Sequence, residues 1–245
     1  MDSVTAAQPT IVATSGGFRE GHRTQLAFAP LVHHAVELAR INGRAPRVAY
    51  LGTAMGDQEW FSARVLAAGH DAGFNTTVLN LFTMPSVGDV RAYLLSQDVV
   101  WVGGGSVANL LAVWRVHGLD VVFREVWEAG VVLGGVSAGS ICWYVGGTTD
   151  SFGPELRPVT NGLALLPWGN GVHMDSDPGR WPLLRALVAD GTLPTSHATD
   201  DGVGLVYAGT ELVEAVSERA GAGAYRLERT ATGVEETPLT PRLLS

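Results

Sequence analysis

The stretch VVLGGVSAG, residues 131–139, decides the fold and points to the chemistry. Its apolar first half is typical of a buried strand, and its second half has the pattern G-x-S-x-G. The pattern predicts a sharp turn from a strand into a helix, with Ser137 at the tip as a nucleophile and the Ala138 amide beside it as an oxyanion donor. Gly135 and Gly139 let strand and helix approach closely. A tight turn without chemistry gives the same pattern, so residues elsewhere in the chain decide between the two.

Short apolar runs alternate with longer helical patterns, which is typical of a mainly parallel sheet with helices on both faces, an α/β fold of three layers. The predicted strands are 11–13, 48–51, 76–79, 99–102 and 131–136, and the predicted helices are 25–42, 60–72, 87–95, 107–117 and 120–129. Runs at 203–207, 212–216 and 224–228 predict antiparallel hairpins that close one edge of the sheet. No linker or repeat interrupts the chain, so residues 1–245 are predicted to form one domain, with 1–9 as a loose tail.

The composition bounds the partners and the compartment. A formal net charge of -8 over 245 residues disfavours nucleic acid and anionic membranes as partners. Cys142 is the only cysteine, so neither an intrachain disulfide nor a cysteine-based zinc site is expected. The first residues lack the basic and apolar regions of a signal peptide, and no apolar run reaches the roughly 20 residues of a membrane span. We therefore expect a cytoplasmic protein.

Ligands of such sheets bind beyond the carboxyl ends of the strands, so the residues that follow each strand are candidates for the site. Residues 103–105 are three glycines after the fourth predicted strand, where the backbone can approach a ligand and aim an amide at a developing oxyanion. A phosphate-binding loop is the rival interpretation. Neither a following Lys-Ser/Thr nor a G-x-G-x-x-G frame supports it.

A nucleophilic serine needs a base and an acid that orients the base. His173 opens an acidic, turn-forming stretch and is the first candidate for the base; its imidazole is expected within hydrogen-bond reach of Ser137, and His197 or His22 are the alternatives. Asp150 is the first candidate for the acid, which gives the chain order serine, acid, histidine. Spacing alone leaves five other acids open, namely Glu155, Asp175, Asp177, Asp200 and Asp201.

Taken together, these motifs resemble the S51 serine peptidases, the family of the aspartyl dipeptidases (peptidase E) and the cyanophycinases. The resemblance rests on the three glycines, the G-x-S-x-G stretch, Thr-Thr-Asp at 148–150, and a histidine segment followed by Arg180. It covers most of the chain, from the first strand to about Tyr207. The resemblance implies a fold related to class I glutamine amidotransferases, with a serine where those enzymes have cysteine.

Carried over position by position, the resemblance implies Ser137 as nucleophile, His173 as base and Asp150 as acid. It implies that the amides of Gly105 and Ala138 form the oxyanion hole. It also implies that Arg180 binds the side-chain carboxylate of an N-terminal aspartate in the substrate. Gly104 and Ser106 are expected to line the substrate site.

The chain also departs from the family pattern. Ser106-Val107 replaces the usual Asn-Thr, and Val172 and Met174 replace the proline and the aromatic residue that flank the histidine in peptidase E. These changes concern substrate preference more than chemistry. The expected function is hydrolysis of short peptides, most of all dipeptides with N-terminal Asp, through an acyl-enzyme and without metal or cofactor. The expected ligand is a small peptide substrate. The protein is expected to be a monomer or a homodimer. A relative acting on β-aspartyl or cyanophycin-like peptides and a non-catalytic binding protein are the alternatives.

Overall fold

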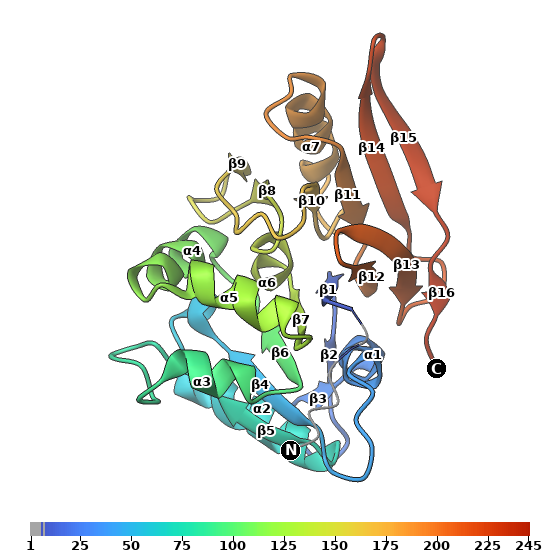
Figure 1. The fold of residues 1–245 in the computed structure, drawn as a ribbon. Helices are drawn as coiled ribbons and strands as arrows, with labels where there is room; N and C mark the ends of the chain where they lie inside the picture. The colour runs from blue at the N-terminus through green and yellow to red at the C-terminus, as the bar shows by residue number, and fades with distance from the viewer. Residues whose placement is uncertain (1–5, 7) are drawn as a thin grey trace.

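The computed structural model describes residue 6 and residues 8–245, which form two large β-sheets and a two-stranded ribbon, with helices packed on the large sheets (Figure 1). The main sheet contains, in spatial order, β16 (Arg242–Leu243), β13 (Glu211–Ser217), β12 (Val203–Ala208), β1 (Thr10–Thr14), β7 (Val132–Val136), β6 (Val99–Val102), β4 (Arg47–Leu51) and β5 (Asn75–Val78). Strands β1, β7, β6, β4 and β5 run parallel to one another, and β12 and β13 form an antiparallel hairpin next to β1. The mainly parallel sheet with an antiparallel C-terminal edge is confirmed.

Helices cover both faces of the main sheet because successive strand residues point to opposite faces and both faces are apolar. In β4, for example, Val48 and Tyr50 belong to one hydrophobic cluster, whereas Ala49 and Leu51 belong to the other. The first cluster is closed by α1 (Pro30–Leu38) and α2 (Glu59–Asp71). The second is closed by α3 (Val90–Leu95), α4 (Val107–Val116), α5 (Leu119–Glu128) and α6 (Ala138–Ile141).

A smaller second sheet stands beside α6, at the top of Figure 1. It contains, in spatial order, β15 (Gly233–Leu239), β14 (Ala224–Thr230), β11 (Ser196–Thr199), β10 (Gly169–Gly171), β8 (Gly146–Thr149) and β9 (Arg157–Val159). Helix α7 (Arg180–Ala189) packs on this sheet through Leu184, Leu187 and Val188. The remaining elements are the short strands β2 (Phe18–Arg19) and β3 (Ala27–Phe28) and the 3₁₀ turn η1 (Thr53–Met55).

The structure differs from the sequence prediction in two elements. The helix predicted at 25–42 begins only at Pro30, because Ala27 pairs with Arg19 and Phe28 with Phe18 in a small antiparallel ribbon. The run predicted as the third hairpin strand, now β14, does not join the edge of the main sheet. It pairs instead with β11 and β15 in the second sheet.

The predicted loose tail at 1–9 lies largely outside the described residues. Two described residues of that segment are held by the rest of the chain. Ala6 is buried and its amide donates to the Gly130 carbonyl at 3.1 Å, and the Gly209 amide donates to the Pro9 carbonyl at 2.7 Å.

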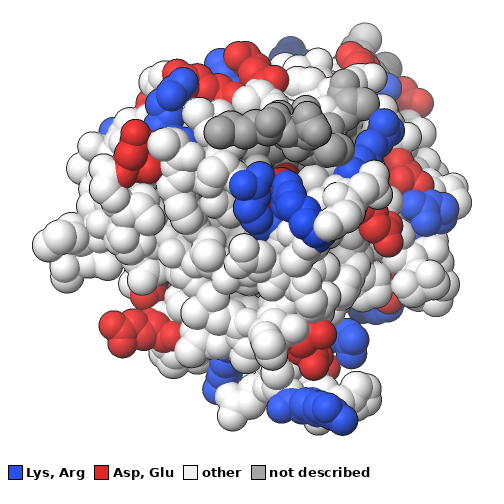
Figure 2. Space-filling view, turned by 60° about the horizontal axis from the view of Figure 1, so that its bottom comes forward, with Lys and Arg blue, Asp and Glu red and all other residues white. Residues whose placement is uncertain are grey.

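The described part of the chain contains no helix long and apolar enough to cross a membrane. On the face shown in Figure 2, acidic and basic side chains are interspersed, and every basic residue of the chain other than histidine is an arginine.

Candidate active site

Ser137 occupies the predicted turn between β7 and α6. Its backbone has φ 58° and ψ -112°, a conformation that a residue with a side chain adopts at a cost of about 1–3 kcal/mol. Two glycines make the turn possible: a Cβ at Gly135 would lie 2.5 Å from the Gly139 carbonyl oxygen, and one at Gly139 would lie 2.2 Å from that of Val102. The Ser137 amide donates to the Thr14 carbonyl at 3.0 Å, which fixes the turn to the end of β1.

The glycine loop after β6 faces the serine. A Cβ at Gly104 would lie 3.3 Å from the Ser137 Cβ and 3.9 Å from its Oγ, so only a glycine leaves space in front of the hydroxyl. Gly105 has φ 129°, a value that L side chains rarely adopt. The amides of Gly105 and Ala138 donate to no described residue, and Ala138, as the first residue of α6, has no acceptor within its helix. A free amide thus directly follows Ser137, and a second lies in the glycine loop that faces it.

His173 approaches the same place from the second sheet. It follows β10, has φ 56°, and its amide donates to the Ser15 Oγ at 3.1 Å. Ser15 directly follows Thr14, which holds the Ser137 amide, so consecutive residues of β1 and its loop anchor Ser137 and His173. The Ser15 hydroxyl is in turn 2.7 Å from the Thr199 Oγ1.

The Ser137 hydroxyl forms no hydrogen bond with His173 or with any other described residue. Contacts of this kind are often long until a substrate is bound. The expectation of hydrogen-bond reach therefore stays a prediction, while the backbone anchors place the two residues on the same edge of the sheet.

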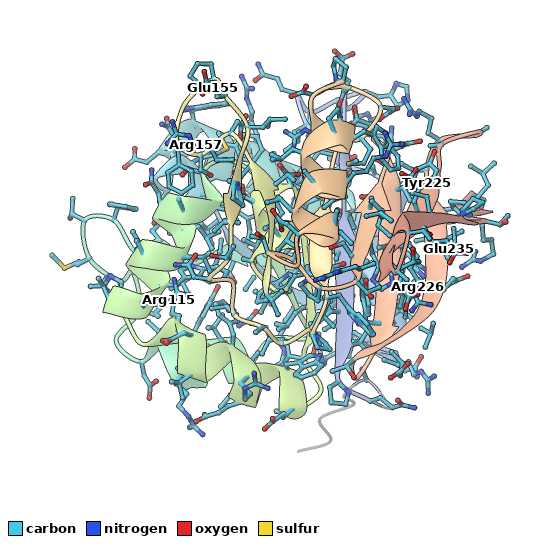
Figure 3. The ribbon with its side chains drawn as sticks, turned by 90° about the horizontal axis from the view of Figure 1, so that it is seen from above. Arg115, Glu155, Arg157, Tyr225, Arg226 and Glu235 are labelled. Carbon is cyan, nitrogen blue, oxygen red and sulfur yellow. The ribbon has the colours of Figure 1, made fainter. Side chains whose placement is uncertain are left out.

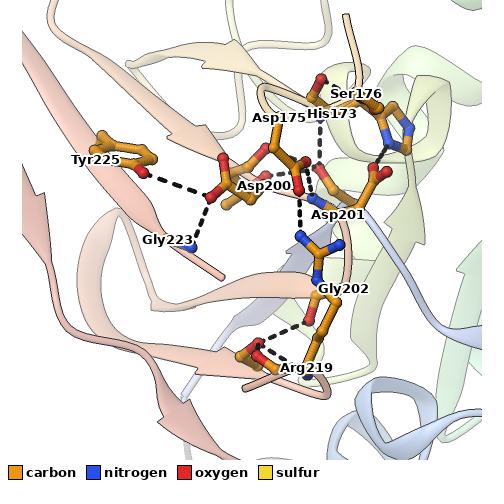
Figure 4. Close-up of polar contacts among 12 residues, drawn as sticks. His173, Asp175, Ser176, Asp200, Asp201, Gly202, Arg219, Gly223 and Tyr225 are labelled. Carbon is orange, nitrogen blue, oxygen red and sulfur yellow. Dashed lines mark hydrogen bonds and ion pairs between the residues drawn. The ribbon is translucent and has the colours of Figure 1, made fainter. Parts of the chain in front are cut away.

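Asp201 is the acid that contacts the imidazole. Its Oδ1 accepts a hydrogen bond from the His173 Nδ1, which leaves Nε2 as the ring nitrogen free for proton exchange (Figure 4). Asp150, the acid expected from the sequence, is exposed at the end of β8, and its carboxylate bonds to no described residue. The structure thus brings Asp201, and not Asp150, to the imidazole, because the link between β11 and β12 passes beside His173.

Asp201 is held in place by a second carboxylate and an arginine. Its amide donates to the Asp175 Oδ1 at 2.8 Å, and the Arg219 guanidinium binds the Asp175 Oδ2 (Figure 4). Burial acts to raise the pKa of Asp175, but the Asp201 amide and Arg219 outweigh it, so this pKa lies below its ordinary value. Asp175 therefore stays charged and fixes the backbone of the acid.

The other candidate acids lie away from the imidazole. Asp200 points the opposite way from Asp201 along the chain, accepts from the Gly223 amide at 2.8 Å, and has its pKa raised by burial. Asp177 accepts from the Gly179 amide in a turn. Glu155 projects from the loop between β8 and β9, on the opposite side of the molecule from Tyr225 of β14 (Figure 3). None of the three contacts His173.

The alternative bases are also elsewhere. His22 is exposed between β2 and β3. His197 is 3% exposed inside the second sheet, where its Nδ1 lies 2.8 Å from the Tyr207 hydroxyl and its ring packs edge-on against Trp168. Burial, and then the charge of Arg226, lower its pKa to about 4. His197 is thus a neutral core residue at ordinary pH.

This burial makes a prediction about stability. The unfolded chain protonates His197 as the pH falls below the ordinary value of 6.5, whereas the folded protein resists protonation until about 4. The free energy of unfolding should therefore lose about 3 kcal/mol from this residue as the pH falls through that window. Urea unfolding at pH 7.5 and at pH 4.5 measures this loss of unfolding free energy. His197→Asn should lose less stability on acidification than the wild type does, whereas the control His22→Asn should lose as much as the wild type. Equal losses in wild type and His197→Asn would contradict the prediction.

Two residues expected to touch substrate differ in their surroundings. The Ser106 hydroxyl accepts from the Asn109 amide at 3.2 Å and caps α4, so it is already engaged. Arg180 begins α7 with its side chain almost wholly buried. Its Nε has no hydrogen-bond partner among the described residues, and the Asp177 carboxylate is 4.0 Å away. A buried guanidinium with free donors is suited to an anionic ligand.

Sequence reasoning gave Ser15 no role and left Asp201 only among the alternatives. Both positions carry a signal, because Ser15 follows the first predicted strand and Asp201 lies two residues before the run at 203–207. Strand β12 is antiparallel to β1, so the residue before it lies at the same edge as the residue after β1. No group of three or more histidine, cysteine, aspartate or glutamate side chains able to hold a metal occurs within the described ranges.

A serine in a strained strand-to-helix turn, two free amides and a histidine–aspartate pair are the parts of a hydrolase site. Comparison with known proteins agrees with that class. Residues 12–214 match Peptidase family S51. The chain is 37% identical over 199 residues to the "Uncharacterized peptidase YgaJ" of Bacillus subtilis (strain 168), covering 81% of this chain and 85% of that protein. It is 30% identical over 135 residues to "Peptidase E" of Streptomyces coelicolor, covering 54% of each.

Among solved structures, a peptidase from an acI-B1 Actinobacterium superposes with a TM-score of 0.68 at 15% identity, over 98% of this chain and 96% of that one. At this identity the likeness concerns the fold. The chain belongs to peptidase family S51, and it is a peptidase.

Proposed function

We propose that this peptidase is a serine exopeptidase that cleaves dipeptides with an N-terminal aspartate through an acyl-enzyme on Ser137. The observation that carries the proposal is that a strained, half-buried serine and the His173–Asp201 pair are anchored on the consecutive residues 14 and 15. A fold without catalytic function has no reason to keep this strain.

The geometry supports the following steps. The Ser137 hydroxyl attacks the scissile carbonyl carbon while the His173 Nε2 takes its proton, and Asp201 stabilises the imidazolium that forms. The carbonyl oxygen becomes an oxyanion between the amides of Gly105 and Ala138, each such donor being worth about 3 kcal/mol in the transition state. His173 then gives the proton to the leaving amine. Water, activated by the same imidazole, releases the aspartate from the serine.

Arg180 supports the preference for aspartate. Its guanidinium is buried and its Nε lacks a described partner, so a substrate carboxylate would satisfy it. The glycines in front of Ser137 leave room for the substrate backbone to come close to the hydroxyl.

A panel of α-Asp-Leu, β-Asp-Leu and Ala-Leu, assayed with wild type and Arg180→Met, tests the proposal. The wild type should cleave α-Asp-Leu best. Arg180→Met should lower kcat/KM for α-Asp-Leu by about 100-fold and for Ala-Leu by less than threefold, because only the first substrate loses a buried ion pair. Arg180→Lys should restore part of the activity, since an ammonium does not reproduce a two-pronged contact.

Arg185→Met is the matched control, because Arg185 lies on the same helix and bonds to Glu236 at the surface. It should leave both substrates unaffected. Equal losses on α-Asp-Leu and Ala-Leu in Arg180→Met would refute the role of Arg180. Preference for β-Asp-Leu would assign the enzyme to β-linked substrates, and no cleavage of any peptide would favour a binding protein.

A further inference from the structure

Asp57 is a buried carboxylate that the proposed mechanism does not use. It follows η1 at the carboxyl edge of the main sheet and is 6% exposed. Burial raises its pKa, against the opposing effect of two backbone amides, and its Oδ1 has no hydrogen-bond partner among the described residues. Burying a carboxylate with one oxygen unpaired costs free energy, so a compensating role is expected for the other oxygen.

The other oxygen ties two loops together. The Asp57 Oδ2 accepts from the Leu81 amide at 2.5 Å and from the Phe82 amide at 3.0 Å, both in the segment after β5. The Asp57 amide donates to the Gly52 carbonyl at 3.1 Å and closes the turn at residues 52–57. The carboxylate thus fastens this turn to the neighbouring loop.

The same turn supports the glycine loop that faces Ser137. The Ala54 carbonyl accepts from the Ser106 amide at 2.9 Å. Gly105 lies so close to it that a Cβ on Gly105 would be 2.4 Å from the Ala54 oxygen. The backbone at residues 105–106 therefore rests on Ala54, and through the turn on Asp57.

Thr53 and Ala54 of the turn are buried against α4, but the turn makes few side-chain hydrogen bonds to other segments. Its residues 53–56 border a hollow of about 520 Å³, whose far wall includes Phe82 and Asn109. On the inner side the Trp114 Nε1 reaches the Thr53 Oγ1 at 3.4 Å, a long contact. The Asp57 carboxylate, with two amide donors, is the side chain that links this turn to the segment after β5.

We propose that Asp57 is a positioning residue for the oxyanion loop. Its carboxylate holds the turn at 52–57 so that Ala54 keeps the Gly105 amide directed at the oxyanion that forms on Ser137 attack. The inference rests on the oxyanion role of Gly105 in the proposed function, and no part of the substrate contacts Asp57.

The test compares two substitutions at Asp57. The residue has φ 52°, which glycine and asparagine both tolerate, so Asp57→Gly removes the carboxylate without new backbone strain and Asp57→Asn keeps an acceptor oxygen. For α-Asp-Leu, Asp57→Gly should lower kcat by about 10-fold to 100-fold with KM within twofold, since a displaced oxyanion donor acts mainly in the transition state. Asp57→Asn should stay within threefold of the wild type.

A second readout does not depend on peptide specificity. A fluorophosphonate reacts with an active serine through a phosphoryl oxygen that occupies the oxyanion site, and fluoride leaves as the Ser137 Oγ–P bond forms. The second-order rate constant of this reaction should fall in Asp57→Gly by the same factor as kcat. A purely structural role would lower the melting temperature and leave this rate constant unchanged.

Asp98→Ala is the matched control. Asp98 is equally buried, accepts from the Arg47 amide at 2.7 Å, and binds Arg44 at the opposite edge of the same sheet. It should lower the melting temperature while kcat and the phosphonylation rate constant stay within twofold. The proposal is overturned if Asp57→Gly, or Asp57→Ser where the glycine variant does not fold, behaves like Asp98→Ala. Failure of the proposed function would give a different result, because the wild type would then neither cleave peptides nor react with the fluorophosphonate. In that case Gly105 has no oxyanion to bind, and the role of Asp57 is refuted as well.

Discussion

Ser137→Ala is expected to lower kcat about a millionfold, to the level of the residual activity that binding and the oxyanion amides supply. The hydroxyl is the only group of this residue that forms the acyl-enzyme, and it bonds to no described residue, so its loss removes chemistry and little else. Initial rates with α-Asp-Leu at saturating concentration measure the effect. The melting temperature should stay within about 2 °C of the wild type.

Ser140→Ala is the control for this substitution. Ser140 lies one turn along α6, and its hydroxyl donates to the Asn170 Oδ1 at 3.0 Å in the core. Its removal should cost stability and leave kcat within tenfold. If Ser137→Ala retained more than about one hundredth of the wild-type rate, the assignment of the nucleophile would be wrong.

Asp201→Asn is expected to lower kcat by about 10⁴-fold with little change in KM. An asparagine amide at this place favours the wrong tautomer of His173 and cannot stabilise the imidazolium charge, which is the effect known for the acid of such triads. Rate measurements across pH 6–9 with α-Asp-Leu give kcat for wild type and variant. Circular dichroism checks that both are folded.

Asp150→Asn is the informative comparison, because the family resemblance implies for Asp150 the role that we propose for Asp201. Asp150 is exposed and makes no described side-chain hydrogen bond, so its replacement should lower kcat by less than threefold. A larger loss in Asp150→Asn than in Asp201→Asn would show that the His173–Asp201 contact is not the catalytic pair.

Much of the fold was predictable because its signals are local. Strand β6 is a run of four buried apolar residues, which is the pattern of a parallel strand covered on both faces, and its bounds were predicted without error. The start of α1 was predicted too early, because residues 27–28 fit the helical pattern but pair with residues 18–19 in a ribbon. The placement of β14 failed for the same reason: its alternation marks a strand, but its partner is chosen by contacts far along the chain.

The site divides along the same line. Ser137 could be predicted because a glycine pattern and a strand-to-helix turn are local features, and His173 because it opens a turn-forming stretch. The acid could not be chosen by spacing, since β8 and β11 flank β10 on its two sides and both Asp150 and Asp201 follow one of these strands. Only the course of the chain after β11 brings one of them to the imidazole. The contacts of Ser15 with residue 173 and of Asp57 with residues 81–82 join segments that are distant in sequence, so no local pattern indicates them.

Covalent labelling of the serine is the most direct test of the central claim that this peptidase works through Ser137. Wild-type protein treated with a fluorophosphonate and digested should yield one modified peptide, with the adduct mapped by mass spectrometry to Ser137, in step with the loss of α-Asp-Leu cleavage. Ser137→Ala should take up no label. Full loss of cleavage without an adduct on Ser137, or cleavage that persists in a fully labelled protein, would contradict the claim.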